Sequence, residues 1–436
     1  MILRENPDAN IIITPSDQMV LHEESFSATM PQFFENRFDS KALKLISSII
    51  IFVFLIPYTA SLYNGLSRLF GMGFNVDYTV CIIVMAILTA VYVIAGGYMA
   101  TAINDFIQGM IMLVGIVAII LSVLKINGGF AGSLDALARI SDALVSETPG
   151  VFASFFGPDP FGLLCVVILT SLGTWGLPQM VQKFYAIKSE NDIHKGTVIS
   201  TVFAIVVAGG CYFLGGFGRL FNVNVAAEGF DAIIPEMLAH LSPAIFGVAL
   251  VLVLSASMST LSSLVLASSS TLTLDFIDPI LFGNKRDEKK NLPIIRIFIA
   301  VFILISAVIA IVQYKKNVTF IAQLMGLSWG ALAGSFLAPF LYSLYWKKTT
   351  KASCIVCFAW GSLLMLANMF FKSSFPAVLQ SPINCGAFAM LGGMVIVPLV
   401  STFTSRPDEQ KIDSVFSCYQ KKVMAPITDV LSSEEA

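Results

Sequence analysis

The amino-acid sequence predicts an all-α membrane protein with about ten transmembrane helices. Of its 436 residues, 56% are hydrophobic and only 12% are charged, whereas about 25% of the residues of an ordinary soluble protein are charged. The mean hydropathy is +0.82, and several apolar runs reach the ~20 residues that a helix needs to cross a hydrocarbon layer. These observations exclude a soluble enzyme and indicate a polytopic protein of the lipid bilayer.

The individual spans follow from the apolar runs in order along the chain. Each run is bounded by polar or charged residues, so its ends can be placed to within about four residues. The expected spans are 44–66, 78–97, 102–124, 158–180, 197–218, 242–274, 293–313, 318–346, 352–371 and 384–404. An even number of spans places both termini on the same side of the membrane.

The positive charges indicate which side that is. The connections on the side of the termini hold 19 of the 26 Lys and Arg residues, and the opposite connections hold 7. Because cytoplasmic connections are rich in Lys and Arg, we expect both termini in the cytoplasm and the chain in the plasma (inner) membrane. The organisation is then a polar N-terminal segment 1–43, a transmembrane domain 44–404 and a tail 405–436. The outer connections 125–157 and 219–241 are expected to form short surface helices.

The residues that enzymes and nucleic-acid-binding proteins need are scarce. The net charge of -2 argues against nucleic acid as a partner. The only histidines are His22, His194 and His240, and there is neither an H-E-x-x-H nor a G-x-S-x-G motif. We therefore expect no catalytic residues.

A row of hydroxyls inside the span 242–274 is costly in a membrane and therefore informative. Ala256, Ser259 and Thr260 are spaced i, i+3 and i+4, so one helix face offers two hydroxyl oxygens beside a main-chain carbonyl. Neutral oxygens suit a small hard cation such as sodium, and a site without carboxylates can release its ion. The alternative is that these hydroxyls bond to carbonyls of their own helix or let two helices approach closely.

The segment 96–108 joins two expected spans. Gly96 and Gly97 are expected to end one helix, and Asp105 lies near the first turn of the next, where a carboxylate stabilises the helix dipole. A capping role is sufficient for Asp105. The alternative is an acidic waypoint for a cation that leaves toward the cytoplasm.

The span 158–180 contains residues that interrupt a helix. Gly173, Gly176 and Pro178 weaken it near its cytoplasmic end, so we expect a kink there. Freed carbonyls at such a depth must line protein or a cavity. Because interrupted spans often hold transporter binding sites, a substrate site here is a hypothesis.

Four stretches, taken together and in this order, resemble motifs of one transporter family. Residues 29–38 (TMPQFFENRF) resemble the pattern T-L-P-D-Y-F-x-x-R-F, and residues 96–108 resemble G-G-x-x-A…D-x-x-Q. Residues 176–184 (GLPQMVQKF) and 256–263 (ASMSTLSS) resemble G-L-P-Q-M-V-x-K-F and A-x-M-S-T-L-S-S. The chain is thereby similar, from about residue 29 to about residue 350, to the sodium:solute symporter family of proline and pantothenate permeases and sodium/glucose transporters.

The resemblance implies a core of two inverted repeats of five helices, with sodium and solute bound near the bilayer midplane. Sodium is the coupling ion and the only metal expected. The Ala256 carbonyl and the Ser259 and Thr260 hydroxyls match the family's sodium ligands, and Asp105 matches an acidic residue of sodium coupling and exit. The positions that match the surroundings of the substrate cavity are Tyr58, Trp175, Pro178 and Trp329.

The chain also departs from the family pattern. Where the family often has Trp-Thr-Asp, this chain has Ile103, Asn104 and Asp105, so the polar partner of the carboxylate is changed. Where proline permeases carry aromatic residues on the kinked span, this chain has Thr170 and Thr174, which weakens the case for proline as the solute.

The family places roughly three helices ahead of the 29–38 motif, so we expect a transporter core that lacks its first helices. A separately encoded N-terminal fragment is then a candidate partner. The expected function is sodium-coupled import of a small organic solute, such as an amino acid, a sugar or a carboxylate, by alternating access. The alternatives are a truncated remnant that does not transport and a membrane sensor or scaffold.

Overall fold

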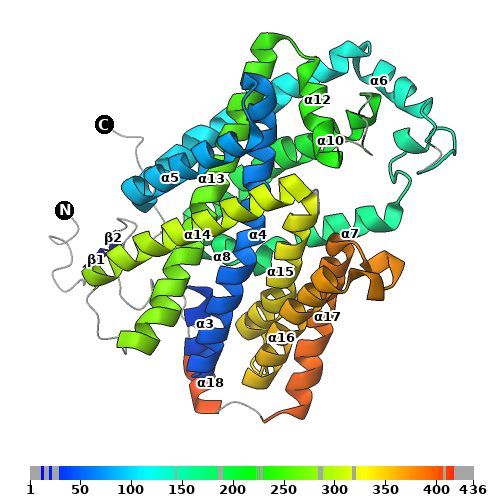
Figure 1. The fold of residues 1–436 in the computed structure, drawn as a ribbon. Helices are drawn as coiled ribbons and strands as arrows, with labels where there is room; N and C mark the ends of the chain where they lie inside the picture. The colour runs from blue at the N-terminus through cyan, green and yellow to red at the C-terminus, as the bar shows by residue number, and fades with distance from the viewer. Residues whose placement is uncertain are drawn as a thin grey trace, which may run out of the picture.

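A computed structural model describes most of the chain. The described residues are 11–13, 19–21, 29–142, 145–184, 190–221, 223, 225, 229–282, 288–316, 321–405 and 409–416. Within them nearly every element is a helix (Figure 1). The exception is a small antiparallel hairpin of β1 (Ile11–Ile13) and β2 (Met19–Leu21), which hydropathy did not predict.

The transmembrane helices agree closely with the expected spans. Eight helical stretches are long and apolar enough to cross a membrane, and two shorter apolar stretches, Tyr78–Ile94 and Pro160–Ser171, match the remaining two expected spans. The long uninterrupted elements are α4 (Lys41–Phe74), α5 (Tyr78–Ile126), α14 (Glu288–Lys316), α15 (Ile321–Tyr345), α16 (Lys351–Phe370) and α17 (Pro382–Phe403). The fold class predicted from the sequence is therefore confirmed.

Two further spans are interrupted. The expected kink is a complete break: α7 (Pro160–Ser171) is followed by the 3-10 turn η2 (Gly173–Gly176) and then by α8 (Pro178–Phe184). Leu177 is extended between them, because the ring of a following proline disfavours the helical conformation. The next span consists of α9 (Glu190–Phe203), the π-helical turn η3 (Ala204–Gly209) and α10 (Gly210–Gly216).

The helix that carries the row of hydroxyls is α13 (Pro243–Thr271), which continues as the π-helical segment η6 (Leu272–Phe282). π-Helical turns often occur at functional sites. Helix α4 packs against both α13 and α15, so it lies between the hydroxyl row and the C-terminal helices (Figure 1).

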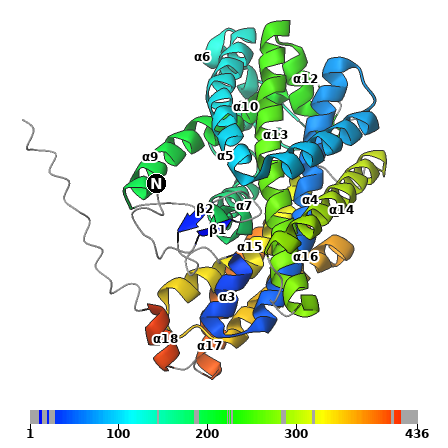
Figure 2. The same ribbon diagram turned by 90° about the vertical axis from the view of Figure 1, so that its left-hand side faces the viewer.

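One local expectation is wrong. The helical backbone of α5 continues through the segment 96–108, although the two halves of α5 run in different directions (Figure 2). Asp105 consequently lies in a helix interior and does not cap an N-terminus. A glycine costs a helix only about 1 kcal/mol, and in hydrocarbon every unpaired backbone group costs more than that, so Gly96 and Gly97 do not end the helix.

Helices α15, α16 and α17 pack closely on one another (Figure 1). A Cβ built on Gly330 would lie 2.6 Å from the Cα of Gly386, and one built on Gly361 would lie 2.3 Å from the Ser335 nitrogen. Such short distances mean that the helix backbones touch, as small residues permit in membrane proteins. Cys357, buried in the same interface, donates a hydrogen bond to the Gly334 carbonyl.

Short helices cover the ends of the bundle. Helix α3 (Met30–Phe38) docks through Phe34, which is fully buried and whose ring lies 5.0 Å from that of Phe358 on α16. Helix α18 (Glu409–Phe416) lies next to α3, with the Phe416 ring 5.2 Å from the Arg37 guanidinium (Figure 2). At the other end, α6 (Gly129–Ala138) and α12 (Ile233–Ala239) confirm the short helices expected in the connections 125–157 and 219–241.

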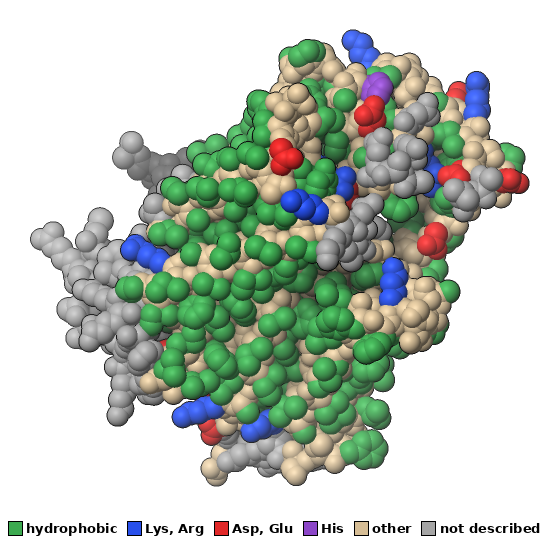
Figure 3. Space-filling view, viewed as in Figure 1, with side chains coloured by type: hydrophobic (Ala, Val, Ile, Leu, Met, Phe, Trp, Pro, Cys, Tyr) green, Lys and Arg blue, Asp and Glu red, His purple; other side chains and the backbone are tan. Residues whose placement is uncertain are grey.

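The surface of the molecule suits a bilayer. On the face shown in Figure 3, hydrophobic side chains cover the broad middle of the molecule, and charged side chains lie mostly toward its upper and lower ends. The span Ile193–Leu220 is the most exposed of the candidate spans, with only 11% of its most apolar window buried.

Candidate functional site

The predicted sodium ligands occupy one turn of α13. Ala256, Ser259 and Thr260 are all half-buried, so this turn is neither sealed in the core nor fully exposed. The Thr260 hydroxyl donates to the Ala256 carbonyl at 3.0 Å, which is the back-bond within the helix considered from the sequence. The Ser259 hydroxyl makes no such back-bond to the described residues. The turn therefore combines one back-bonded hydroxyl with one that is available to a ligand.

The chemistry of this turn suits a small hard cation. Hard cations hold oxygen ligands at about 2.3–2.6 Å, so one ion can reach both the Ala256 carbonyl and the Thr260 oxygen, which are 3.0 Å apart. Binding requires the Thr260 proton to turn away from the carbonyl, because a cation needs the lone pairs of both oxygens. A carbonyl and two hydroxyls carry no net charge, so the ion is held without a carboxylate.

Asp105 is linked to this turn by Tyr92, which like Asp105 belongs to α5. Its carboxylate interacts electrostatically with the Tyr92 hydroxyl, although 13 residues of a straight helix would separate the two by about 20 Å. Helix α5 therefore changes direction between them, and Figure 2 shows its two halves running in different directions. The Tyr92 hydroxyl donates a hydrogen bond to the Met258 carbonyl on α13. The charge of the predicted coupling carboxylate thus acts on a residue that is hydrogen-bonded to the predicted ligand turn.

Two of the four predicted cavity residues are in contact. The rings of Tyr58 on α4 and Trp329 on α15 meet edge to face, with centroids 5.7 Å apart, and each side chain is 9% exposed. Ser328 donates a hydrogen bond to the Phe54 carbonyl one turn before Tyr58. This bond joins α15 to α4 beside the aromatic pair, and so holds the two helices that carry the two rings.

The other two predicted cavity residues lie on the broken span. Pro178 is buried at the start of α8, whereas Trp175 is 56% exposed on η2. A Cβ built on Gly176 would lie 2.9 Å from the Leu337 nitrogen, so the break in this span is pressed against α15. Gln179 is 4% exposed, and neither atom of its amide has a hydrogen-bond partner among the described residues. We did not predict Gln179 as a site residue; its place beside Pro178 was the available signal.

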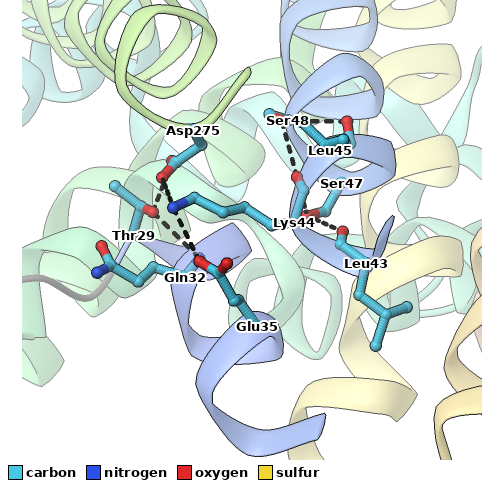
Figure 4. A network of polar contacts seen from close by, with 9 residues as sticks. All are labelled: Thr29, Gln32, Glu35, Leu43, Lys44, Leu45, Ser47, Ser48 and Asp275. Carbon is cyan, nitrogen blue, oxygen red and sulfur yellow. Dashed lines mark hydrogen bonds and ion pairs between the residues drawn. The ribbon is translucent and has the colours of Figure 1, made fainter. Parts of the chain in front are cut away.

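A buried polar network joins the N-terminal helix to α13 (Figure 4). The Lys44 Nζ lies 2.8 Å from a Glu35 carboxylate oxygen and 3.7 Å from one of Asp275. The Thr29 hydroxyl donates to the other oxygen of Asp275 at 2.6 Å. Asp275 is only 2% exposed, and it lies on η6, the continuation of the helix with the ligand turn. No sequence pattern brings together residues so far apart, so this network was not predicted.

A second network lies at the opposite end of the bundle. Asp231, in the connection 219–241, accepts hydrogen bonds of 3.1 and 3.2 Å from the Ile321 nitrogen at the start of α15. Arg68 on α4 approaches the same carboxylate to 3.7 Å. Burial raises the pKa of Asp231 above its usual 3.8, although the Ile321 hydrogen bonds and Arg68 oppose that shift. One carboxylate therefore links the connection 219–241 to both α4 and α15.

Known proteins resemble most of this chain. The family model described as sodium:solute symporter family matches residues 19–361. A sodium/proline symporter of Staphylococcus aureus is 30% identical over 365 residues, which cover 81% of this chain and 68% of the relative. Its counterpart in strain JH9 is 29% identical over 367 residues, with the same coverage.

A solved structure shares the fold. The substrate-bound, outward-open structure of a Na+-coupled sialic acid symporter superposes with a TM-score of 0.62 at 17% identity, covering 87% of this chain and 78% of that one. The likeness at such low identity concerns the fold alone. Together with the matched family model, these similarities confirm the resemblance found in the motifs. The chain belongs to the sodium:solute symporter family, a family of transporters, and its coupling ion is sodium.

Proposed function

We propose that this chain imports a small organic solute together with sodium, and that the sodium ion binds at Ala256, Ser259 and Thr260 on α13. The observation that carries the proposal is the partial burial and the hydrogen bonding of this turn. Its hydroxyls are half-buried, Ser259 is not back-bonded, and the Ala256 and Thr260 oxygens are close enough to share an ion. A turn used only for packing would be expected to be fully buried, with every hydroxyl back-bonded.

The solute is proposed to bind beside the aromatic pair of Tyr58 and Trp329, close to the break at Pro178. Aromatic side chains supply apolar contact area, and a helix break supplies free backbone groups for the polar ends of a solute. Because the relatives described above are sodium/proline symporters, a small amino acid is the first solute to test. Thr170 and Thr174 have no aromatic ring to contact proline, and both hydroxyls bond to carbonyls of their own turn.

The mechanism needs only that each ligand prefers the appropriate conformation. Sodium at Ser259 and Thr260 would stabilise an outward-open state, and the solute would then close the outer side. Opening inward would let sodium leave past Asp105. The membrane potential supplies ~2.3 kcal/mol per 100 mV for each ion, which corresponds to roughly fifty-fold accumulation of solute.

Uptake into proteoliposomes tests the proposal. Labelled proline, a sugar and a carboxylate are each offered with and without an inward sodium gradient. For the solute that accumulates, Thr260→Ala is expected to raise the half-saturating sodium concentration about ten-fold or more, because a bond to a charged group is lost. Thr201→Ala is the matched control, since Thr201 makes the same back-bond at 2.7 Å on an exposed turn of α9.

The outcomes separate the alternatives. Sodium-driven accumulation by the wild-type chain excludes both a non-transporting remnant and a sensor or scaffold. Absence of accumulation for every solute would contradict the transport proposal. Accumulation with the same sodium dependence in Thr260→Ala and Thr201→Ala would leave transport standing but remove the proposed ion site.

The orientation and surroundings of the chain are also proposals. The excess of Lys and Arg on one side supports cytoplasmic termini in the plasma (inner) membrane, with 44–404 as the transmembrane domain between segment 1–43 and tail 405–436. Cysteine labelling from either side would test this orientation. A separately encoded N-terminal fragment is a candidate partner, and its co-purification with the tagged chain is the corresponding test.

A further inference from the structure

A hydrogen bond from α5 reaches the turn of α13 that carries the proposed sodium ligands. The Tyr92 hydroxyl, on α5, donates a hydrogen bond to the carbonyl of Met258, which lies between Ala256 and Thr260. Tyr92 is half-buried and packs against the main hydrophobic core. The donor and the acceptor are 166 residues apart in the sequence, so this bond joins two helices and does not merely complete one.

Among the residues that the structure describes, the other side-chain hydrogen bonds to this turn come from α13 itself. Thr260 donates to the Ala256 carbonyl, and Ser262 and Ser263 donate to the Ser259 carbonyl at 2.9 and 3.2 Å. Bonds within one helix cannot fix the rotation or the height of that helix relative to a neighbour. The bond from Tyr92 can, because its donor belongs to another helix.

The Tyr92 hydroxyl also interacts with two further groups. These are the Ser262 side chain and the charge of Asp105. Tyr92 therefore interacts both with the carboxylate proposed for sodium exit and with the helix that carries the turn proposed for sodium binding. A change at either place can reach the other through this one hydroxyl.

We infer that Tyr92 is a positioning residue for sodium: it holds the turn 256–260 of α13 in the register against α5 in which its oxygens can receive the ion. This inference rests on the sodium site proposed above. The role assigned to the Tyr92 hydroxyl is its hydrogen bond to the Met258 carbonyl, and not a bond to the ion. Its contribution is to fix the ligand oxygens before the ion arrives, so that less order has to be imposed on binding.

The hydroxyl can be removed without breaking the fold. A backbone carbonyl has two lone pairs, so Met258 keeps its helix hydrogen bond when Tyr92 is replaced by Phe. The aromatic ring, which makes the core contacts, is retained. Loss of one net hydrogen bond of ordinary strength is expected to weaken sodium binding by about three- to ten-fold.

The test is equilibrium binding of radioactive sodium to the purified full chain in detergent, which needs no knowledge of the solute. Tyr92→Phe is compared with Tyr342→Phe. Tyr342 is a matched control, because its hydroxyl also donates across helices to a methionine carbonyl, that of Met394, at 3.0 Å, but between α15 and α17. The expected result is a three- to ten-fold rise in the sodium dissociation constant for Tyr92→Phe and no change for Tyr342→Phe.

The readout separates positioning from general loosening of the bundle. If both variants weaken sodium binding equally, the effect is structural and the inference is wrong. If Tyr92→Phe binds sodium as tightly as the wild type, the inference is also wrong, while the sodium site stands. If the wild-type chain binds no sodium saturably, the proposed site itself fails, and the role of Tyr92 fails with it.

Discussion

Replacement of Lys44 by Met removes the only cation within ion-pairing distance of the Asp275 carboxylate among the described residues. Methionine keeps the length and the apolar stem of the side chain. Glu35 and Asp275 are then left as two carboxylates with no positive charge between them, and Asp275 is 2% exposed. Thr29 still donates to Asp275, but a hydroxyl does not replace an ammonium.

The magnitude follows from burial. Removal of one partner of a buried ion pair costs about 3–5 kcal/mol, mostly because the remaining charge is left uncompensated. Glu35 is 21% exposed and can gain some water, so the cost is dominated by Asp275. We expect Lys44→Met to lower the free energy of unfolding by about 3–5 kcal/mol. The double variant Lys44→Met/Asp275→Asn should recover much of this loss, because the buried charge disappears together with its partner.

Unfolding in mixed micelles by titration with SDS, followed by circular dichroism, measures this difference. The control is Lys347→Met, since Lys347 pairs with Asp413 at 2.7 Å but both side chains are largely exposed. An exposed pair contributes about 0.2–1 kcal/mol. The reasoning is refuted if the two variants lose the same stability, or if adding Asp275→Asn makes Lys44→Met worse.

The remaining predictions concern a titratable group and a helix contact. The pKa of Asp231 is raised in the folded protein, so the folded state binds the proton more tightly than the unfolded chain does. The free energy of unfolding therefore falls as the pH rises from 3.8 through the pKa of the folded state. Unfolding free energies measured across the acidic range should show this slope in the wild type and a smaller one in Asp231→Asn. Gly361→Ala should cost about 1–3 kcal/mol by overpacking α16 against α15. Gly247→Ala, with nothing within 4 Å of the new Cβ, should instead stabilise the protein by roughly 0.5–1 kcal/mol. Equal effects of Gly361→Ala and Gly247→Ala on thermal unfolding would contradict the close packing of α16 on α15.

Hydropathy was sufficient to predict most of the transmembrane helices. The span expected at 352–371 is α16, Lys351–Phe370, and the span expected at 384–404 is α17, Pro382–Phe403. Such spans need only a long apolar run between polar ends, which is a property of the sequence itself. Gly173, Gly176 and Pro178 predicted a kink in the span 158–180 for a similarly local reason, although the structure shows a complete break between α7 and α8.

The continuous course of α5 was not predictable in the same way. Gly96 and Gly97 weaken a helix in water, where free backbone groups can bond to solvent. In hydrocarbon the backbone has no such partner, so a helix can continue through glycines. Asp105 was therefore given a capping interpretation that the structure excludes, and the alternative interpretation stays a prediction.

Contacts between distant segments could not be read from the sequence. Thr29 and Asp275 are 246 residues apart, and Asp231 is 90 residues from Ile321. Each pair depends on how several helices pack, which hydropathy does not specify. The ligand turn was found because its three residues belong to one helix, whereas Tyr92, which contacts the turn from another helix, gave no local signal.

The central claim is that the ion binds to the hydroxyls of one turn of α13. Its most direct test is equilibrium binding of radioactive sodium to the purified chain and to the double variant Ser259→Ala/Thr260→Ala. We predict saturable binding of sodium by the wild type and loss of that binding in the double variant, with its helical content unchanged. Saturable binding of unchanged affinity in the double variant would contradict the claim.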